Sequence, residues 1–409
     1  MNRPPGPRGS RLTGNLAAYE QDRLGFVLEQ TNTYGPVWSF DSRTVVAAGA
    51  DEAGEVLTRP EFVVGTDHLH REMSVSKAQR SHTRSARMLG LRPSAVTGWT
   101  SRITATIESS LSGWPDEIDV VAELRRLTSG LGAALCFGED AATMVEREQE
   151  LFAALTPIAG SAFRMPRWVP WSAPARTDRA NRELESRIQT LIDRRRTGQA
   201  AASDDILTLL MTPTGRHGEL DDEPLRSALV STWLAAQSSP TAGMAWVLLD
   251  LARHPEAREL AAQGLEGTRA VVQESMRVHP PTWLLERTVA EDTELAGYHL
   301  PAGTMVKCSP YLVHRDERYF TDPERFRLDR WAPDGEGTRA PRFAYLPFGV
   351  GARVCMGMAW SMALMTNLTH LIVRRFHLRE LPGATWFPDP GRELIPRGLR
   401  LGVVSGTAG

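Results

Sequence analysis

Apolar residues recur three and four positions apart from about residue 51 to residue 270, and few segments there alternate. This period is typical of amphipathic helices. Helices are predicted at 119–136 and 179–195, and the longest and most apolar one at 226–253. If that last segment is continuous, its 28 residues form a helix of about 42 Å, long enough to cross a whole domain.

Strand-like patterns are few and short. Residues 37–50 contain one strand region, and the pattern becomes strand-like again at 288–300 and 305–309. The Pro-Ala-Gly-Thr stretch between the last two segments predicts a turn. These short segments predict a small β part beside a mainly helical chain.

The remaining segments predict one more helix and several irregular stretches. The chain opens on a Pro/Gly-rich segment, a last helix is predicted at 356–376, and a Gly/Pro-rich tail follows it. The Pro- and charge-rich stretch 315–347 is long enough to suggest a function. Because no repeat or linker divides the chain, we expect a single domain over residues 1–409, large enough to bury a group at its centre.

Charge and composition exclude several classes of protein. The 47 Lys+Arg and 49 Asp+Glu residues leave a net charge of −2, so neither nucleic acid nor an anionic membrane is an expected partner. No stretch reaches 18 uncharged apolar residues, and the N-terminus has no apolar run. Three cysteines far apart exclude a disulfide scaffold and indicate a reducing compartment. A soluble, cytoplasmic protein is therefore expected.

One of these cysteines lies in a distinctive loop. Cys355 ends the stretch Pro-Phe-Gly-Val-Gly-Ala-Arg-Val-Cys, directly before an apolar helix. Gly349 and Gly351 permit tight turns and close approach to a flat partner. A helix N-terminus stabilises a thiolate, and Arg353 is placed to meet an anionic group beside a metal. These features fit a seat for haem, with Cys355 as the axial ligand. The alternative is a structural cysteine before a helix.

The same stretch resembles the haem loop of the cytochrome P450 enzymes, Phe-x-x-Gly-x-Arg-x-Cys-x-Gly. Phe348, Gly351, Arg353, Cys355 and Gly357 fill all of its fixed positions, which happens by chance in about one chain in 10⁴. The resemblance implies heme b with Cys355 as thiolate ligand. It also implies the P450 fold, mainly α with small β-sheets, with the haem between the long central helix and the Cys-loop helix. The expected cofactor-binding residues of the loop are Phe348, Gly349, Arg353 and Gly357. The other two cysteines, Cys136 and Cys308, are interpreted as apolar core residues.

A Glu-x-x-Arg pair supports the resemblance by its position. Glu274 and Arg277 lie one helical turn apart, 81 positions before Cys355, and a His-Pro-Pro sequence follows them as in the family. The resemblance implies that they form a buried ion network with a third arginine. We predict Arg325 for that role, with Arg330 as the competitor; the alternative is a surface salt bridge.

Three further cations are implied by the resemblance to bind the haem propionates. Arg287 follows the Pro-Pro pair by six residues, where the family places such an arginine. His82 and Arg87 lie in a segment that partly matches a family motif, with Ala86 where a second arginine is expected. Two buried carboxylates without cations would be costly.

The long helix departs from the family pattern. The family's Ala-Gly-x-Asp/Glu-Thr-Thr corresponds to Ala-Ala-Gln-Ser-Ser-Pro at 235–240, so Ser238 occupies the acid position and Ser239 the alcohol position. These two serines are the predicted catalytic residues. Ser239 can donate a hydrogen bond, but Ser238 cannot replace a carboxylate as a proton relay. Pro240 is expected to kink the helix. Either ordered water takes the place of the acid, or the site suits chemistry other than plain hydroxylation.

The leading hypothesis is a P450 enzyme that activates O2 with electrons from a ferredoxin and ferredoxin reductase. Its expected substrate is a bulky, aromatic small molecule of bacterial specialised metabolism, oxidised with C–C or C–N coupling as one outcome. The resemblance implies that the substrate pocket is formed by residues 62–71, 159–171, 234–239, 282–285 and 394–395. Aromatic residues in these segments, among them Phe163, Trp168, Trp171 and Trp283, would stack on such a substrate. The alternatives are ordinary hydroxylation of a terpenoid or polyketide, a haem-binding sensor without turnover, and a structural protein without haem.

Overall fold

The computed structural model describes residues 2–10, 14–64, 77–145, 169–170, 172–199, 204–213 and 220–406. The chain forms two compact units. Unit 1 comprises the described residues of Met1–Leu69, Ala242–Met358 and Thr369–Gly409, and unit 2 those of His70–Thr241 and Ala359–Leu368. No helix within these described ranges is long and apolar enough to cross a membrane.

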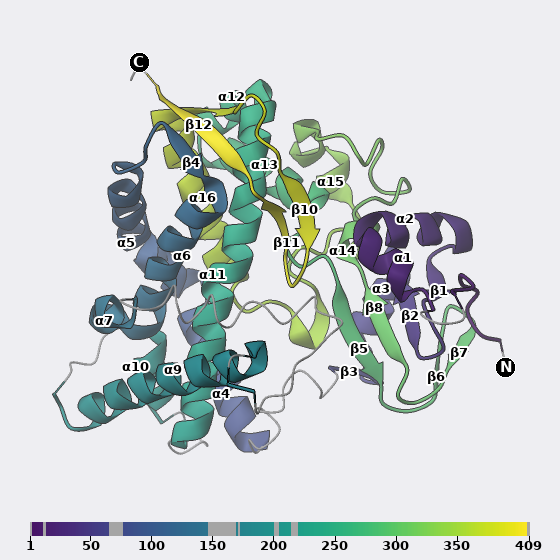
Figure 1. Ribbon diagram of the computed structural model, residues 1–409, viewed down its shortest axis with the longest axis horizontal. Helices are drawn as coiled ribbons and strands as arrows, with labels where there is room; N and C mark the ends of the chain where they lie inside the picture. The colour runs from purple at the N-terminus through teal and green to yellow at the C-terminus, as the bar shows by residue number, and fades with distance from the viewer. Residues whose placement is uncertain are drawn as a thin grey trace. The chain divides into compact units, whose positions relative to one another are not determined.

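Unit 1 contains a five-stranded sheet (Figure 1). Its order is β1 (Val37–Ser39), β2 (Thr44–Ala47), β8 (Met305–Cys308), β5 (Leu285–Val289) and β3 (Phe62–Val63). Strands β2 and β8 pair in parallel, whereas the other pairs are antiparallel. The register places Arg287 opposite Val306. Buried apolar residues of the sheet and of α3 (Ala50–Thr58) form one core cluster that includes Cys308.

The other elements of unit 1 lie before, between and after these strands. The helices are α1 (Leu16–Gln21), α2 (Arg23–Tyr34), α12 (Pro255–Ala262), α13 (Leu265–Val278), α14 (Pro310–Val313), η4 (Leu328–Trp331), α15 (Glu336–Arg339) and η5 (Gly351–Arg353). The strands are β6 (Thr293–Leu295), β7 (Tyr298–Leu300), β9 (Phe376–Glu380), β10 (Phe387–Pro390), β11 (Leu394–Arg397) and β12 (Arg400–Ser405). No strand was predicted in the Gly/Pro-rich tail, but this segment forms the β10–β11 hairpin and the antiparallel pair β9–β12.

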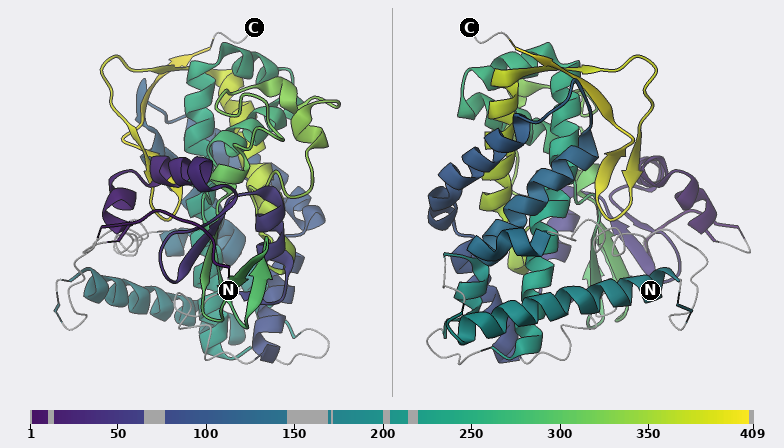
Figure 2. Two further views of the ribbon diagram at one scale, coloured as in Figure 1. Left: turned by 90° about the vertical axis from the view of Figure 1, so that its right-hand side faces the viewer. Right: turned by 60° about the vertical axis from the view of Figure 1, so that its left-hand side comes forward.

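Unit 2 is mainly helical. It contains α4 (Lys77–Gly90), α5 (Pro93–Leu111), β4 (Glu117–Asp119), α6 (Val120–Phe137), η3 (Gly138–Asp140), α7 (Ala141–Val145), α9 (Ala173–Arg196) and α10 (Ile206–Met211). The first part of α9 extends beyond the predicted helix, and α9 crosses the start of α11 (Figure 2). At this crossing the Gln189 side-chain amide donates to Asp222 at 2.7 Å.

Two long helices carry residues of both units. Helix α11 (Asp222–Arg253) runs without a break through Pro240, so the predicted long helix is confirmed and begins four residues earlier than expected. Helix α16 (Met358–Arg375) confirms the predicted last helix. In unit 2 α11 packs on α6, where Trp233 is fully buried and contacts Phe137 edge-on.

Candidate functional site

The loop before α16 in unit 1 presents the Cys355 thiol. Gly349 (φ +65°) and Gly351 (φ +79°) both take left-handed backbone conformations, and a Cβ on Gly351 would collide with the Leu57 carbonyl oxygen. The Cys355 N–H donates to the Phe348 carbonyl oxygen at 2.9 Å and closes the loop. The local structure therefore requires glycine where the sequence has it.

The surroundings of the thiol are partly apolar. Cys355 is exposed, and so are the apolar side chains of Val354, directly before it, and Met358, three positions after it. Desolvation raises the pKa of Cys355, while a backbone hydrogen bond from Gly357 acts in the opposite direction. The helix N-terminus was expected to favour the thiolate, but in the protein alone desolvation outweighs that effect. A bound cation at the sulfur would reverse this balance.

Two guanidinium groups of unit 1 lie close enough to interact. Arg287 on β5 is buried and donates to the Glu286 carbonyl oxygen at 2.8 Å. Burial lowers the pKa of Arg287, and the positive charge of Arg353 lowers it further. Within the described parts of the chain, no carboxylate forms an ion pair with either side chain. Two such cations fit an anionic group with two carboxylates.

A buried ion network in unit 1 joins α13 to the chain segment that precedes this loop. Glu274 and Arg277 are both fully buried, and the Arg277 Nη2 donates to Glu274 Oε1 at 2.8 Å. The third arginine is Arg330, whose Nε lies 3.3 Å from the same oxygen. The prediction of Arg325 is wrong, because its side chain is exposed and only its carbonyl oxygen accepts from Arg277, at 3.0 Å.

His314 connects this network to the cysteine loop. It is fully buried, its Nδ1 lies 3.2 Å from the Arg277 carbonyl oxygen, and its Nε2 accepts from the Leu346 N–H at 2.7 Å. Burial lowers the pKa of His314 to about 3, so the ring is neutral and accepts at one nitrogen. No motif in the sequence marked His314; its place directly after the apolar Tyr-Leu-Val of α14 was the available signal of burial.

Unit 2 holds the remaining candidates. Ser238 and Ser239 are half-buried on α11, on the same side as Ala235 and Ser231. Arg87 on α4 donates to the Ser231 hydroxyl at 3.3 Å, which brings it to this side of α11. The side chain of His82 lies outside the described part of the structure. The roles predicted for these residues stay predictions.

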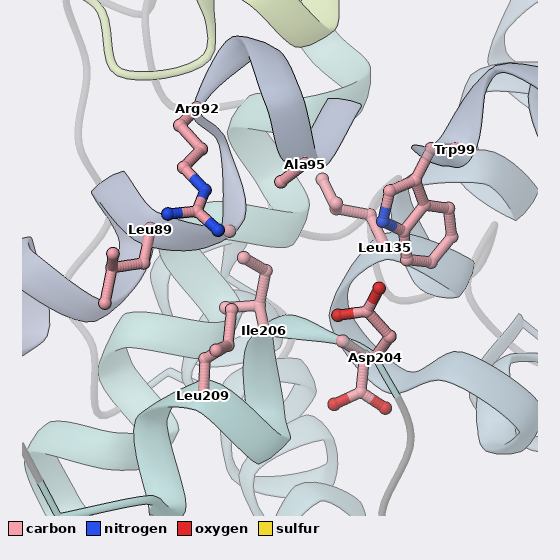
Figure 3. Close-up of a pocket in the computed structure, with 10 residues that line it drawn as sticks. Leu89, Arg92, Ala95, Trp99, Leu135, Asp204, Ile206 and Leu209 are labelled. Atoms are coloured by element: carbon pink, nitrogen blue, oxygen red, sulfur yellow. The ribbon is translucent and has the colours of Figure 1, made fainter. Parts of the chain in front are cut away.

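The predicted aromatic pocket receives little support. Trp283 is almost fully buried, and its indole lies 3.4 Å from the Gly391 carbonyl oxygen, as in ordinary packing. Phe163, Trp168 and Trp171 lie outside the described residues. A hollow of about 190 Å³ lies in unit 2, lined by Leu89, Arg92, Trp99, Leu135, Asp204 and Ile206 among others. Figure 3 shows how these residues lie. It contains none of the predicted site residues.

Comparison with known families decides the class of protein. The family model described as Cytochrome P450 matches residues 4–392. This chain belongs to the cytochrome P450 family. It is therefore a P450 monooxygenase with a haem-thiolate cofactor. The donor set of unit 1 fits that group, since it offers an exposed thiol in a glycine-shaped loop and two guanidiniums that form no ion pair with a carboxylate of the described residues.

Named relatives and solved structures support the family and the fold. The P450 is 28% identical over 378 residues to cyclooctat-9-en-7-ol 5-monooxygenase of Streptomyces melanosporofaciens, covering 84% of this chain and 82% of the relative. It is 26% identical over 421 residues to taxane 10-beta-hydroxylase of Taxus cuspidata, covering 91% and 83%. A solved structure of a cyanobacterial P450 with retinoic acid bound matches with a TM-score of 0.84 at 22% identity, covering 99% of both chains. The predicted mainly helical P450 fold is thus confirmed.

Proposed function

We propose that Cys355 is the thiolate ligand of the haem iron in this P450. The observation that supports this most strongly is the closed loop that presents Cys355, with Phe348, Gly349 and Gly357 shaping it. Arg287 and Arg353 would hold the propionates, together with His82 and Arg87. When bound, the haem supplies the activation of dioxygen. The protein residues bind it, orient it and supply protons.

The proposed substrate is a bulky small molecule of bacterial specialised metabolism, and the proposed reaction is its hydroxylation. The names of the relatives support this: one is a 5-monooxygenase of cyclooctat-9-en-7-ol and another a taxane 10-beta-hydroxylase. Both align over more than four fifths of this chain. A terpenoid-like polycycle is therefore better supported than the aromatic substrate expected from the sequence, because Trp283 is buried in packing.

Oxidative coupling of an aromatic substrate is a second candidate, and the pair Ser238/Ser239 favours it. Without a carboxylate at position 238, protons must come through water or from the substrate itself. A substrate N–H or O–H would then supply one hydrogen atom, and a C–H or N–H of the bonding partner a second, as the C–C or C–N bond forms. Dioxygen activated at the haem would accept both hydrogens and leave as water.

Mass spectrometry under isotopically labelled dioxygen distinguishes the two reactions. Hydroxylation gives a product that gains one labelled oxygen. Coupling gives a product that loses two hydrogens and carries no label, and this result would overturn the leading proposal. A screen for compounds that shift the haem spectrum supplies the substrate, beginning with cyclooctat-9-en-7-ol.

We also propose that both units act as one P450 domain, supported by the family model that spans them.

Electrons would come from an acidic ferredoxin, itself reduced by a ferredoxin reductase. Exposed arginines beside the loop, such as Arg342 and Arg353, would attract it. Since salt screens such attraction, turnover limited by ferredoxin should slow as salt rises. Equal rates at low and high salt would contradict this attraction.

A further inference from the structure

A buried carbonyl group at the end of α13 and a buried N–H before the cysteine loop each need a partner. Arg277 is fully buried and is the next-to-last residue of α13, so its carbonyl oxygen has no donor within the helix. Leu346 is 2% exposed and lies outside any helix or strand, so its N–H takes part in no regular ladder. Because buried backbone groups are almost always hydrogen-bonded, whatever lies between these two must offer both a donor and an acceptor.

One side chain satisfies both groups. The ring of His314 is fully buried, with its Nδ1 3.2 Å from the Arg277 carbonyl oxygen and its Nε2 accepting from the Leu346 N–H at 2.7 Å. A neutral imidazole has one donor and one acceptor, so this pairing places the proton on Nδ1. The Arg277 guanidinium also donates to the His314 carbonyl oxygen at 3.1 Å. Arg277 therefore holds His314 through both its backbone and its side chain.

Hydrogen bonds continue from Leu346 into the loop that presents Cys355. The Leu346 carbonyl oxygen accepts from the Gly349 N–H at 3.1 Å, which closes a turn in which Gly349 has a φ of +65°. Phe348 lies within this turn, and its carbonyl oxygen accepts from the Cys355 N–H at 2.9 Å. One tight turn and one hydrogen bond therefore separate the residue held by His314 from Cys355.

The residue before Leu346 has its own attachment to α13. The Tyr345 hydroxyl donates to the Gln273 carbonyl oxygen at 3.0 Å, and its ring centroid lies 5.1 Å from that of His314. This bond holds the chain near α13 but leaves the Leu346 N–H without an acceptor. The orientation of the peptide that begins the turn is thus set by His314.

We propose that His314 is a positioning residue that fixes the turn before Cys355 and thereby keeps the thiolate in place as the ligand of the haem iron. This inference rests on the proposed function, in which Cys355 is that ligand. His314 acts through Leu346, not by contact with the iron. Its role is separate from that of the Glu274 carboxylate, because it uses the Arg277 carbonyl oxygen and an uncharged ring.

Two variants of similar side-chain length separate the hydrogen bond from packing. His314→Gln keeps an acceptor near the position of Nε2, whereas His314→Met fills similar space without one. On mild heating, the carbon-monoxide band of the haem thiolate should be lost about tenfold faster in His314→Met than in the native protein, and within about twofold of the native rate in His314→Gln. The exposed His377→Met is the matched control and should keep the native rate. Equal rates in His314→Gln and His314→Met would overturn the proposal.

Hydrogen exchange at single-amide resolution tests the attachment independently of the spectrum. In haem-loaded His314→Met, the Leu346 amide should exchange about tenfold faster than in the native protein, because the local opening costs less. The amides of the β9–β12 pair, elsewhere in unit 1, should keep their native rates. An unchanged Leu346 amide, or equal acceleration in both places, would overturn the positioning role.

Two measurements keep the outcomes separate. If His314→Met does not fold, the Leu346 amide is followed in the native protein and in His314→Gln, and in both it should exchange at least about a hundredfold more slowly than an unstructured amide. Fast exchange there would overturn the proposal. If the native protein lacks the carbon-monoxide band, the proposed function fails, whereas the exchange of the Leu346 amide still tests its attachment to His314.

Discussion

The carboxylate of Glu274 shows how one buried charge organises a segment that has no regular structure. It accepts from Arg277 and Arg330, from the Trp331 indole at 3.0 Å and from the Arg327 backbone N–H at 2.9 Å. Arg277 and Arg330 also donate to carbonyl oxygens between residues 314 and 325. The two arginines thereby fix the chain between β8 and the cysteine loop to α13.

Arg330→Met should therefore destabilise the protein strongly. Removing one partner of a buried ion pair typically costs about 3–5 kcal/mol, because the other charge is left uncompensated. Arg325→Met is the matched control, since its exposed guanidinium takes no part in the network. Chemical unfolding and haem content measure both variants. Equal stability of the two variants would contradict the assignment of Arg330.

Asp250 on α11 is a buried acid whose charge state affects stability. Burial raises the pKa of Asp250 to about 7, and the charge of Glu274 acts in the same direction. The folded protein thus keeps a proton that the unfolded chain has released above about pH 4. Between these two values each pH unit lowers the free energy of unfolding by up to about 1.4 kcal/mol through this group.

Asp250→Asn should remove this contribution. Its melting temperature relative to the native protein should rise as the pH goes from acidic to neutral and level off above about pH 7. The exposed Asp334→Asn serves as the matched charge-removing control. Melting followed by circular dichroism over this range measures the difference. A difference that stays constant over this range would show that Asp250 is ionised in the folded protein.

At the residue level, the sequence identified the residues of a contiguous motif. It did not identify which of two nearby arginines binds Glu274. The cysteine loop is one contiguous stretch, so its glycines, Arg353 and Cys355 were found together. Arg325 and Arg330 are five positions apart in an irregular segment, where no period shows which one is buried. The indole of Trp331, which donates to Glu274, was the signal for the buried member.

Among the elements, α11 is the one in which sequence and regular structure conflict. It continues through Pro240 although proline removes a backbone hydrogen bond and crowds the preceding turn. Pro240→Ala should restore the bond to the Ala236 carbonyl and raise the free energy of unfolding by about 1–3 kcal/mol.

Pro93→Ala is the matched control for this helix. Pro93 is the first residue of α5, where proline is well tolerated, so its replacement should change stability little. The urea concentration at the midpoint of unfolding compares the two variants. If Pro240→Ala is no more stable than the native protein, the proline costs the helix nothing.

The sequence predicted the long helices correctly, because the helical period of apolar residues repeats several times in each of them. Helices α6, α9, α11 and α16 each have at least 18 residues. It failed for β9 to β12, which have four to six residues each and carry Pro388, Pro390 and Pro396. Proline argues against a central strand, but β10 and β11 form a two-stranded hairpin, in which both strands are edge strands.

For the whole molecule, the family and the class of cofactor follow from the sequence, whereas the substrate does not. The family model covers residues 4–392 and includes both compact units. The fold brings Arg287 on β5 close to Arg353 before α16, although these two chain segments are far apart in sequence. Substrate contacts come from such distant segments as well, so a local pattern does not reveal them.

The carbon-monoxide difference spectrum of the reduced protein tests the central claim most directly. Thiolate ligation by Cys355 predicts the red-shifted Soret band from which the family takes its name. Cys355→Ser should lose this band. The buried Cys136→Ala and Cys308→Ala should retain it, because both thiols lie in apolar cores. A folded, haem-loaded native protein without the band, or a Cys355→Ser variant that keeps it, would contradict the account.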